Sequence, residues 1–167
     1  MAKYNKEYYE PLEQMMAVRH QYMSKILRDH TDQDIYNFFQ NKQVLDLGCG
    51  TGEFLNNYFE MGAQCTGIDI EKNFKLKNKK NFSLYNLDAN TFLKNCKKKF
   101  DIIFLFEFLE HLEEGDKHKL FKNLIKILNK NALIFVSTLN KNLLSKYLAI
   151  DIACLLYTSP SPRDVPW

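Results

Sequence analysis

Several residue types are scarce in this chain, and each scarcity narrows what the protein can be. The 167 residues include only four cysteines, six glycines, four prolines and one tryptophan. Cys49, Cys65 and Cys96 lack the paired spacing of a disulfide framework or a zinc site, so we expect a reducing compartment. Three of the six glycines fall within residues 48–52, and this short stretch therefore becomes the first candidate for a ligand site.

Long apolar runs and a strong charge are also missing. No apolar stretch approaches the ~18 residues of a membrane span and no signal peptide is evident, so we expect a cytoplasmic protein. A net charge of +3 is too small to indicate a nucleic-acid partner. The lysine-rich stretches 72–80 and 94–99 lack aromatic interleaving suited to base stacking, and they predict solvated loops.

The composition and local patterns divide the chain into three parts. With 46% hydrophobic and 26% charged residues, the chain has the composition of a globular domain. Residues 1–40 predict an N-terminal helical segment, because their apolar residues recur at helical spacing. Residues 41–153 predict the main domain. Residues 154–167 resemble a translated sequencing-library adapter, so we expect a non-native tail and a main domain that lacks its C-terminal strands.

A glycine loop after an apolar run is the strongest motif. Val44-Leu45-Asp46-Leu47 precedes Gly48-Cys49-Gly50-Thr51-Gly52, and a helix is expected over 53–61. Glycines accept positive φ and let a backbone approach a ligand where a Cβ would clash. The start of a helix offers free N–H groups. The pattern therefore predicts a nucleotide-type site at the carboxyl end of a parallel strand.

A carboxylate after the next expected strand fits the same site. Asp69 lies 17 residues beyond Gly52, close to the spacing of about 20 in dinucleotide-binding folds, where the acid binds the ribose hydroxyls. The glycine pattern differs from the dinucleotide fingerprint, because it is Gly-x-Gly-x-Gly with Asp46 just before it. Asp69 is thus predicted to bind a ribose in a site of another kind.

Alternating strand and helix signals predict an α/β fold with a Rossmann-like, doubly wound parallel sheet. The continuous apolar run of 100–106 is typical of a central strand that is covered on both faces. The expected strands are 44–47, 64–70, 82–87, 100–106 and 132–137, and the expected helices after residue 31 are 32–39, 53–61, 116–128 and 141–153.

A second polar group follows the central expected strand. Glu107, Glu110 and His111 are spaced i, i+3 and i+4, so they share one face if the segment is helical. Two carboxylates and an imidazole can hold a hard divalent cation, and the imidazole can instead act as a general base. In a purely structural role, the acids would complement a helix N-terminus and His111 would make a structural hydrogen bond.

These motifs together resemble the class I S-adenosylmethionine (SAM) methyltransferases, and among them the ubiquinone-biosynthesis O-methyltransferases. The specific elements are Gly48-Cys49-Gly50, the Glu-x-x-Glu-His segment of 107–111, and Ser137-Thr138-Leu139-Asn140 followed by a Lys-Ser-type helix. The resemblance covers about residues 11–153. Region 71–85 is shorter than in that family, and Asn129-Lys130-Asn131 replaces its Lys-Pro-Gly-Gly turn; asparagine tolerates the left-handed conformation, so the turn can survive.

The resemblance assigns roles to individual residues. It implies SAM as the cofactor and Mg²⁺ as a candidate metal. Glu107, Glu110 and His111 are the implied metal ligands, and His111 and Glu107 are the implied catalytic residues. The implied SAM-binding residues are Arg19, Asp46, Gly48, Cys49, Gly50, Gly52, Asp69, Ile70, Asp88, Ala89 and Phe106.

The implied reaction is methyl transfer from SAM to a phenolic or catechol hydroxyl of a polyprenylated ubiquinone precursor. Such lipid-soluble quinols reside in membrane, and the apolar stripe of 141–153 fits either a peripheral contact with the inner membrane face or ordinary core packing. The alternatives are a SAM-dependent methyltransferase with another small-molecule acceptor, a non-catalytic SAM-binding remnant, and a nicotinamide-dependent oxidoreductase.

Overall fold

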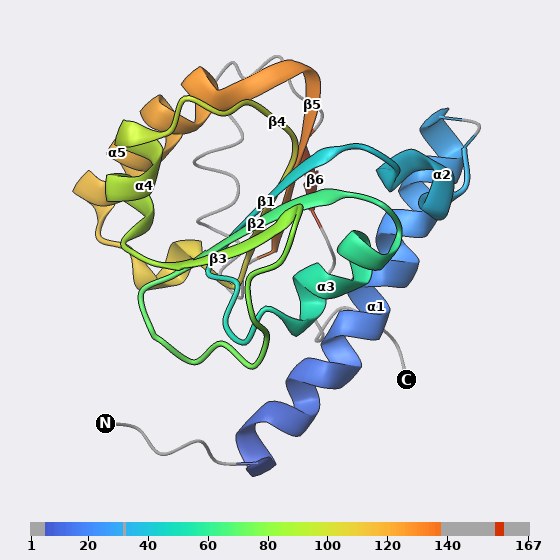
Figure 1. The fold of residues 1–167 in the computed structure, drawn as a ribbon, viewed down its shortest axis with the longest axis horizontal. Coiled ribbons are helices and arrows are strands. Elements are labelled where there is room, and N and C mark those ends of the chain that lie inside the picture. Colours follow the sequence, from blue (N-terminus) through green and yellow to red (C-terminus); the bar gives the residue numbers. More distant parts are fainter. Residues whose placement is uncertain (1–5, 32, 138–155, 159–167) are drawn as a thin grey trace.

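One parallel sheet with helices on both faces organises the chain in the computed structural model, which describes residues 6–31, 33–137 and 156–158 (Figure 1). The sheet order is β3-β2-β1-β4-β5-β6, and all neighbouring strands are parallel. The strand order turns back at β1 and β4, which is where doubly wound sheets bind their ligands. The strands are β1 Gln43–Leu47, β2 Gln64–Asp69, β3 Phe82–Asn86, β4 Phe100–Phe106, β5 Leu128–Ser137 and β6 Leu156–Thr158.

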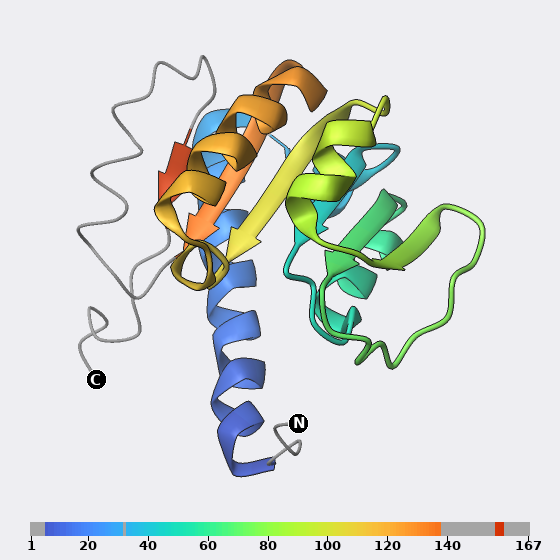
Figure 2. The same cartoon turned by 90° about the vertical axis from the view of Figure 1, so that its left-hand side faces the viewer.

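The helices form two layers, with α1 and α3 on one face of the sheet and α4 and α5 on the other (Figures 1 and 2). Successive side chains of a strand point to opposite faces, so Ile102 and Phe104 of β4 pack toward α1 and α3, while Ile103 and Leu105 pack toward α4 and α5. The helices are α1 Lys6–Thr31, α2 Ile35–Phe39, α3 Glu53–Glu60, α4 Ala89–Asn95 and α5 Glu114–Leu124, with 3₁₀ turns η1 Leu109–His111 and η2 Ile125–Ile127.

Aromatic packing holds α3, and with it the glycine loop, against the sheet. The Tyr58 ring lies 4.4 Å from that of Phe39 and 5.0 Å from that of Phe104 between ring centroids. Phe54 meets Phe104 edge-on at 5.5 Å. Edge-on and tilted ring pairs add about 0.5–1.5 kcal/mol each to the burial of apolar area. These contacts fix α3, and so the glycine loop before it, against the sheet.

The crossovers on either side of β3 differ from the expected pattern. Helix α4 was not predicted, although Asp88 caps it by accepting a hydrogen bond from the Thr91 N–H at 2.8 Å. Aspartate is a preferred N-cap residue, and this signal could have located the helix. Residues 70–81, which connect β2 to β3, contain no helix. This shorter connection agrees with the short region noted between 71 and 85.

The entry into β5 departs from the prediction in its bounds, whereas the backbone at Asn131 has the left-handed conformation that asparagine was expected to tolerate. The helix expected over 116–128 ends at Leu124 and continues as η2, and β5 begins at Leu128 rather than at residue 132. Asn131 has a φ of 63°, so asparagine adopts the left-handed conformation in the segment that replaces the Lys-Pro-Gly-Gly turn. The pairing of β4 with β5 shifts register between Phe100 and Ile102.

The edge of the sheet beyond β5 carries a strand that the sequence did not predict. The short β6 lies parallel to β5, with Ile134 opposite Leu156, although residues 156–158 belong to the expected non-native tail. The expected helix over 141–153 and the segment 138–140 lie outside the described residues, as does the rest of the tail. Within the described ranges, no helix combines the length and the apolar character needed to cross a bilayer.

Candidate functional site

A cavity of about 450 Å³ opens at the carboxyl ends of β1, β2 and β4. Its volume lies in the range of small-molecule sites, about 300–1,000 Å³. The walls come from the glycine loop, the segment after β2, the start of α4 and the segment after β4. The lining residues are Gly48, Gly50, Thr51, Ile68, Asp69, Ile70, Glu71, Asn73, Leu87, Asp88, Ala89, Glu107, Phe108, His111 and Leu112.

The glycine loop is folded back over the end of β2. The backbone N–H groups of Gly48 and Cys49 donate to the Ile68 carbonyl at 2.8 and 3.1 Å. Gly48 and Gly50 have φ values of 81° and 53°, which a residue with a Cβ rarely adopts. No atom lies within 4 Å of the place where a Cβ on Gly50 would stand, so the loop leaves open space for a ligand at this point.

Asp69 is held at the cavity by backbone donors on both sides. Its Oδ2 accepts from the Gly50 N–H at 2.7 Å, and its Oδ1 accepts from the Glu71 N–H at 2.8 Å. A carboxylate has about four acceptor positions, so each oxygen keeps one for a ligand hydroxyl. The geometry orients the acid at the tip of β2, where the ribose-binding carboxylate was predicted.

Apolar and polar groups alternate on the wall next to Asp69. Ile70 is 74% exposed and Leu87 is 39% exposed, although both are large and apolar. Asp88 and Ala89 also line this part of the cavity; α4 begins at Ala89, and one oxygen of Asp88 caps that helix. A flat heterocycle would cover the two exposed apolar side chains, and the other oxygen of Asp88 could accept from its amino group.

The segment after β4 does not form the helical face that the sequence predicted. Glu107 has a φ of 49°, which separates it from the 3₁₀ turn η1, so it does not share a helix with Glu110 and His111. Its Oε1 accepts from Arg19 Nη2 at 3.1 Å and from Ser137 Oγ at 2.8 Å. The Glu107 N–H also donates to the Ser137 carbonyl at 3.0 Å. Glu107 is therefore fixed by α1 and by the end of β5.

This arrangement does not fit a metal centre at the three predicted ligands. Among the described residues, no group of three or more His, Cys, Asp or Glu side chains is placed to hold a metal ion. Glu107 and His111 line the cavity. Glu107 Oε1 accepts from Arg19 and Ser137, whereas Oε2 is buried without a hydrogen-bond partner. His111 is exposed at the end of η1, within reach of a molecule in the cavity.

Arg19 and Phe106 lie next to Glu107, outside the cavity lining. The Arg19 guanidinium sits over the Phe106 ring at 4.9 Å from its centroid, and Phe106 stacks on Phe104 at 5.2 Å. The side chain of Arg19 is only 11% exposed. In this structure Arg19 therefore contacts Glu107 and Phe106 and is not part of the cavity lining.

Asp46 is buried beneath the glycine loop, on the face of the sheet that α1 and α3 cover. Burial raises its pKa to about 7; the nearby Arg19 opposes this shift, and the charge of Asp69 adds to it. Burial also raises the pKa of Cys65 to about 12 and that of the Cys49 thiol still further. Both cysteines therefore remain thiols at neutral pH and act as small apolar side chains.

Eight of the predicted site residues come together on the cavity wall: Gly48, Gly50, Asp69, Ile70, Asp88, Ala89, Glu107 and His111. Among the described residues, the lining does not include Arg19, Asp46, Cys49, Gly52, Phe106 or Glu110, which support the wall or lie next to it. The prediction missed Thr51, Ile68, Glu71, Asn73, Leu87, Phe108 and Leu112. For Phe108 and Leu112 the available signal was their place beside Glu107 and His111, in the segment that follows the central strand.

Comparisons with known proteins agree with this arrangement. The methyltransferase domain family matches residues 18–163. A ubiquinone biosynthesis O-methyltransferase of Pelagibacter ubique (strain HTCC1062) is 33% identical over 149 residues, which cover 85% of this chain and 61% of that protein. The chain thus spans about three fifths of the length of these curated relatives.

Solved structures with a similar fold include a SAM-dependent methyltransferase from Archaeoglobus fulgidus. It is 27% identical, has a TM-score of 0.54, and the match covers 76% of this chain and 56% of that one. The plantazolicin methyltransferase BamL, solved with a triazolic desmethylPZN analog and SAH, shares the fold at 22% identity with a TM-score of 0.64, over 85% and 53% of the two chains. Because the family match spans residues 18–163, the chain belongs to the methyltransferase domain family.

Proposed function

We propose that this chain is the core of a SAM-dependent O-methyltransferase that methylates a phenolic or catechol hydroxyl of a polyprenylated ubiquinone precursor. The observation that supports SAM as the cofactor is the position of Asp69, which the N–H groups of Gly50 and Glu71 hold at the cavity at 2.7 and 2.8 Å. The name of the 33% identical relative supports the acceptor. SAM, when bound, supplies an electrophilic methyl group on its sulfonium.

Different residues of the cavity would bind different parts of SAM. Asp69 would accept the ribose hydroxyls, because each of its oxygens keeps an acceptor position. Ile70 and Leu87 would cover the adenine, and the uncapped oxygen of Asp88 would accept from its amino group. Gly50 leaves room for the methionine end, because nothing fills the place where its Cβ would stand. The chain thereby supplies proximity and orientation, which are the main requirements of methyl transfer.

His111 is the proposed proton acceptor for the acceptor hydroxyl. A phenol with a pKa of about 10 is a weak nucleophile at neutral pH, so a group near the reacting oxygen must take its proton. His111 lines the cavity and is exposed, and an imidazole commonly takes this role. Glu107 lies on the same wall and would add negative charge that stabilises the protonated imidazole.

Mg²⁺ bound by Glu107, Glu110 and His111 is the competing proposal for activating the phenol. No three-ligand group is assembled among the described residues, although Glu107 Oε2 is buried without a hydrogen-bond partner. The mechanism above therefore uses no metal. A peripheral contact with membrane through residues 141–153, which lie outside the described residues, remains part of the proposal because the acceptor is lipid-soluble.

Titration of the 167-residue chain with S-adenosylhomocysteine (SAH), the methyl-transfer product, tests the cofactor. We expect saturable binding in calorimetry. Binding should be at least tenfold weaker for Asp69→Asn, because the amide replaces one of the two acceptor oxygens with an NH₂ group. Asp29→Asn is the matched control, since Asp29 is exposed on α1 and outside the cavity lining. Tighter binding of NAD than of SAH would instead indicate an oxidoreductase.

Transfer of a labelled methyl group from SAM to a short-chain catechol tests the acceptor. Labelled product from the catechol, and none from a carboxylate or an amine of similar size, is the expected result. SAH binding without transfer to any acceptor would favour a non-catalytic SAM-binding protein.

A further inference from the structure

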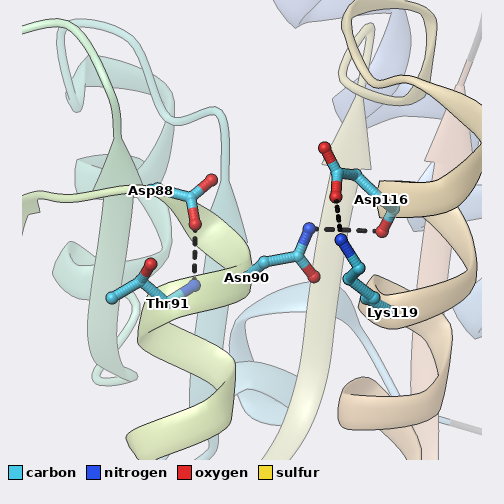
Figure 3. A network of polar contacts seen from close by, with 5 residues as sticks. All are labelled: Asp88, Asn90, Thr91, Asp116 and Lys119. Atoms are coloured by element: carbon cyan, nitrogen blue, oxygen red, sulfur yellow. Dashed lines mark hydrogen bonds and ion pairs between the residues drawn. The ribbon is translucent and has the colours of Figure 1, made fainter.

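We propose that Asn90 is a positioning residue that sets two walls of the cofactor cavity relative to each other. Asn90 lies in the first turn of α4, outside the cavity lining, and its Nδ2 donates to the Asp116 carbonyl of α5 at 3.2 Å (Figure 3). The proposal rests on the proposed function, since it takes the cavity to be the SAM site.

The hydrogen bond joins the starts of two helices that each follow lining residues of the cavity. Asp88 and Ala89, on one wall, immediately precede Asn90 in the chain. His111 and Leu112, on the other wall, end just before α5 begins at Glu114. A change in the distance between the two helix starts would therefore move the adenine side of the cavity relative to the proposed proton acceptor.

Apolar packing alone would leave this distance poorly defined. Helices α4 and α5 share an apolar cluster that includes Leu93, Leu120 and Leu124, and such contacts are non-directional. The hydrogen bond from Asn90 is directional, and it joins α4 and α5 at their N-terminal ends. The other amide atom, Asn90 Oδ1, is buried without a hydrogen-bond partner, which opposes folding. An apolar side chain of similar size would avoid that cost, so stability and positioning can be separated by mutation.

The surrounding polar contacts provide matched controls. Lys119 Nζ pairs with the Asp116 carboxylate at 2.8 Å, whereas Asn90 uses the Asp116 backbone carbonyl (Figure 3). Lys119→Ala therefore removes the ion pair and leaves the interhelical hydrogen bond in place. Asn95 donates to Thr91 within α4 itself at 3.0 Å, so Asn95→Ala removes an amide from the same helix without touching α5.

The experiment is SAH titration of the whole 167-residue chain as wild type, Asn90→Leu, Lys119→Ala and Asn95→Ala, with the melting temperature of each. We expect Asn90→Leu to keep or raise the melting temperature and to weaken SAH binding about three- to tenfold, the equivalent of one neutral hydrogen bond. The two controls should bind like the wild type. Amide hydrogen exchange should rise in Asn90→Leu at residues 88–92 and 113–117 and stay unchanged in β1.

Normal SAH affinity in a folded Asn90→Leu protein would overturn the proposal. If leucine does not fit, Asn90→Ala is measured in the same way, with the same expected loss of affinity. A loss of affinity that follows the melting temperature across all variants would assign Asn90 a merely structural role and would also overturn it. Absence of SAH binding in the wild type would instead count against the proposed function.

Discussion

A Cβ on Gly48 would stand 2.8 Å from Cδ2 of Phe108. The glycine loop after β1 and the segment after β4 are therefore packed at a distance that only a glycine permits. Gly48 also has a φ of 81°. Both residues line the cavity. The two neighbouring strand ends therefore constrain one another, and the shape of the site depends on this contact.

Gly48→Ala should disturb both folding and cofactor binding. The left-handed backbone and the contact with Phe108 each oppose a methyl group, so we expect a loss of about 1–3 kcal/mol in the free energy of unfolding and at least tenfold weaker SAH binding. Urea unfolding and calorimetry measure the two effects.

Gly115→Ala is the control for that substitution. Gly115 lies in the first turn of α5 with nothing within 4 Å of its Cβ position. Alanine should stabilise the helix there by about 0.5–1 kcal/mol. Equal destabilisation by both substitutions would show that the fold tolerates no added methyl in general, and the particular role of Gly48 would be lost.

The Arg19–Glu107 pair should be energetically coupled. Its side chains are only 11% and 18% exposed, so removal of one partner leaves the other poorly solvated. A double-mutant cycle with Arg19→Ala and Glu107→Gln should give a coupling of about 1–3 kcal/mol in the free energy of unfolding. The exposed Lys119–Asp116 pair should give about 0–1 kcal/mol. Similar values for both pairs would contradict the assignment of Glu107 as a buried anchor.

Asp46 should make stability depend on pH in an unusual direction. Its pKa is raised by burial from 3.8 to about 7, so the folded state holds a proton that the unfolded state releases. Its contribution to the unfolding free energy is therefore greatest at low pH and declines as pH rises from about 4 to about 7. Asp46→Asn removes this titration.

The difference in unfolding free energy, Asp46→Asn minus wild type, should rise by roughly 2–3 kcal/mol between pH 5 and pH 7. Urea unfolding of both proteins across that range measures it, and the subtraction cancels the other carboxylates. A difference that stays constant with pH would mean that Asp46 is ionised throughout.

Removal of metal should leave turnover unchanged, whereas removal of His111 should not. We expect EDTA to have no effect on methyl transfer, and His111→Ala to lower kcat by about 10²–10⁴-fold with SAH affinity retained. The assay is methyl transfer to a short-chain catechol at saturating SAM. Activity that is lost in EDTA and restored by Mg²⁺ would favour the metal proposal, with Glu107 Oε2 as the oxygen that has no hydrogen-bond partner.

Local sequence patterns predicted those features of the site that are formed by residues close together in the chain. The glycine loop and the acid at the end of β2 were both predicted, because each follows from short-range backbone geometry. Asparagine was expected only to tolerate the left-handed conformation in 129–131, and Asn131 adopts it. Helix α4 was missed although its N-cap, Asp88, was available as a signal. The condition under which Glu107, Glu110 and His111 would share a helical face is not met, because the backbone at Glu107 is left-handed.

The sequence by itself determined the parallel α/β sheet and placed the ligand site at its carboxyl edge, because strand periodicity and glycine turns are local properties of the chain. Only the tertiary structure decided the partners of Glu107. Arg19 is 88 residues away in sequence and Ser137 is 30 residues away, and no spacing rule predicts that they meet at one carboxylate. Their meeting depends on how α1 and β5 pack against the sheet, which is a property of the whole fold.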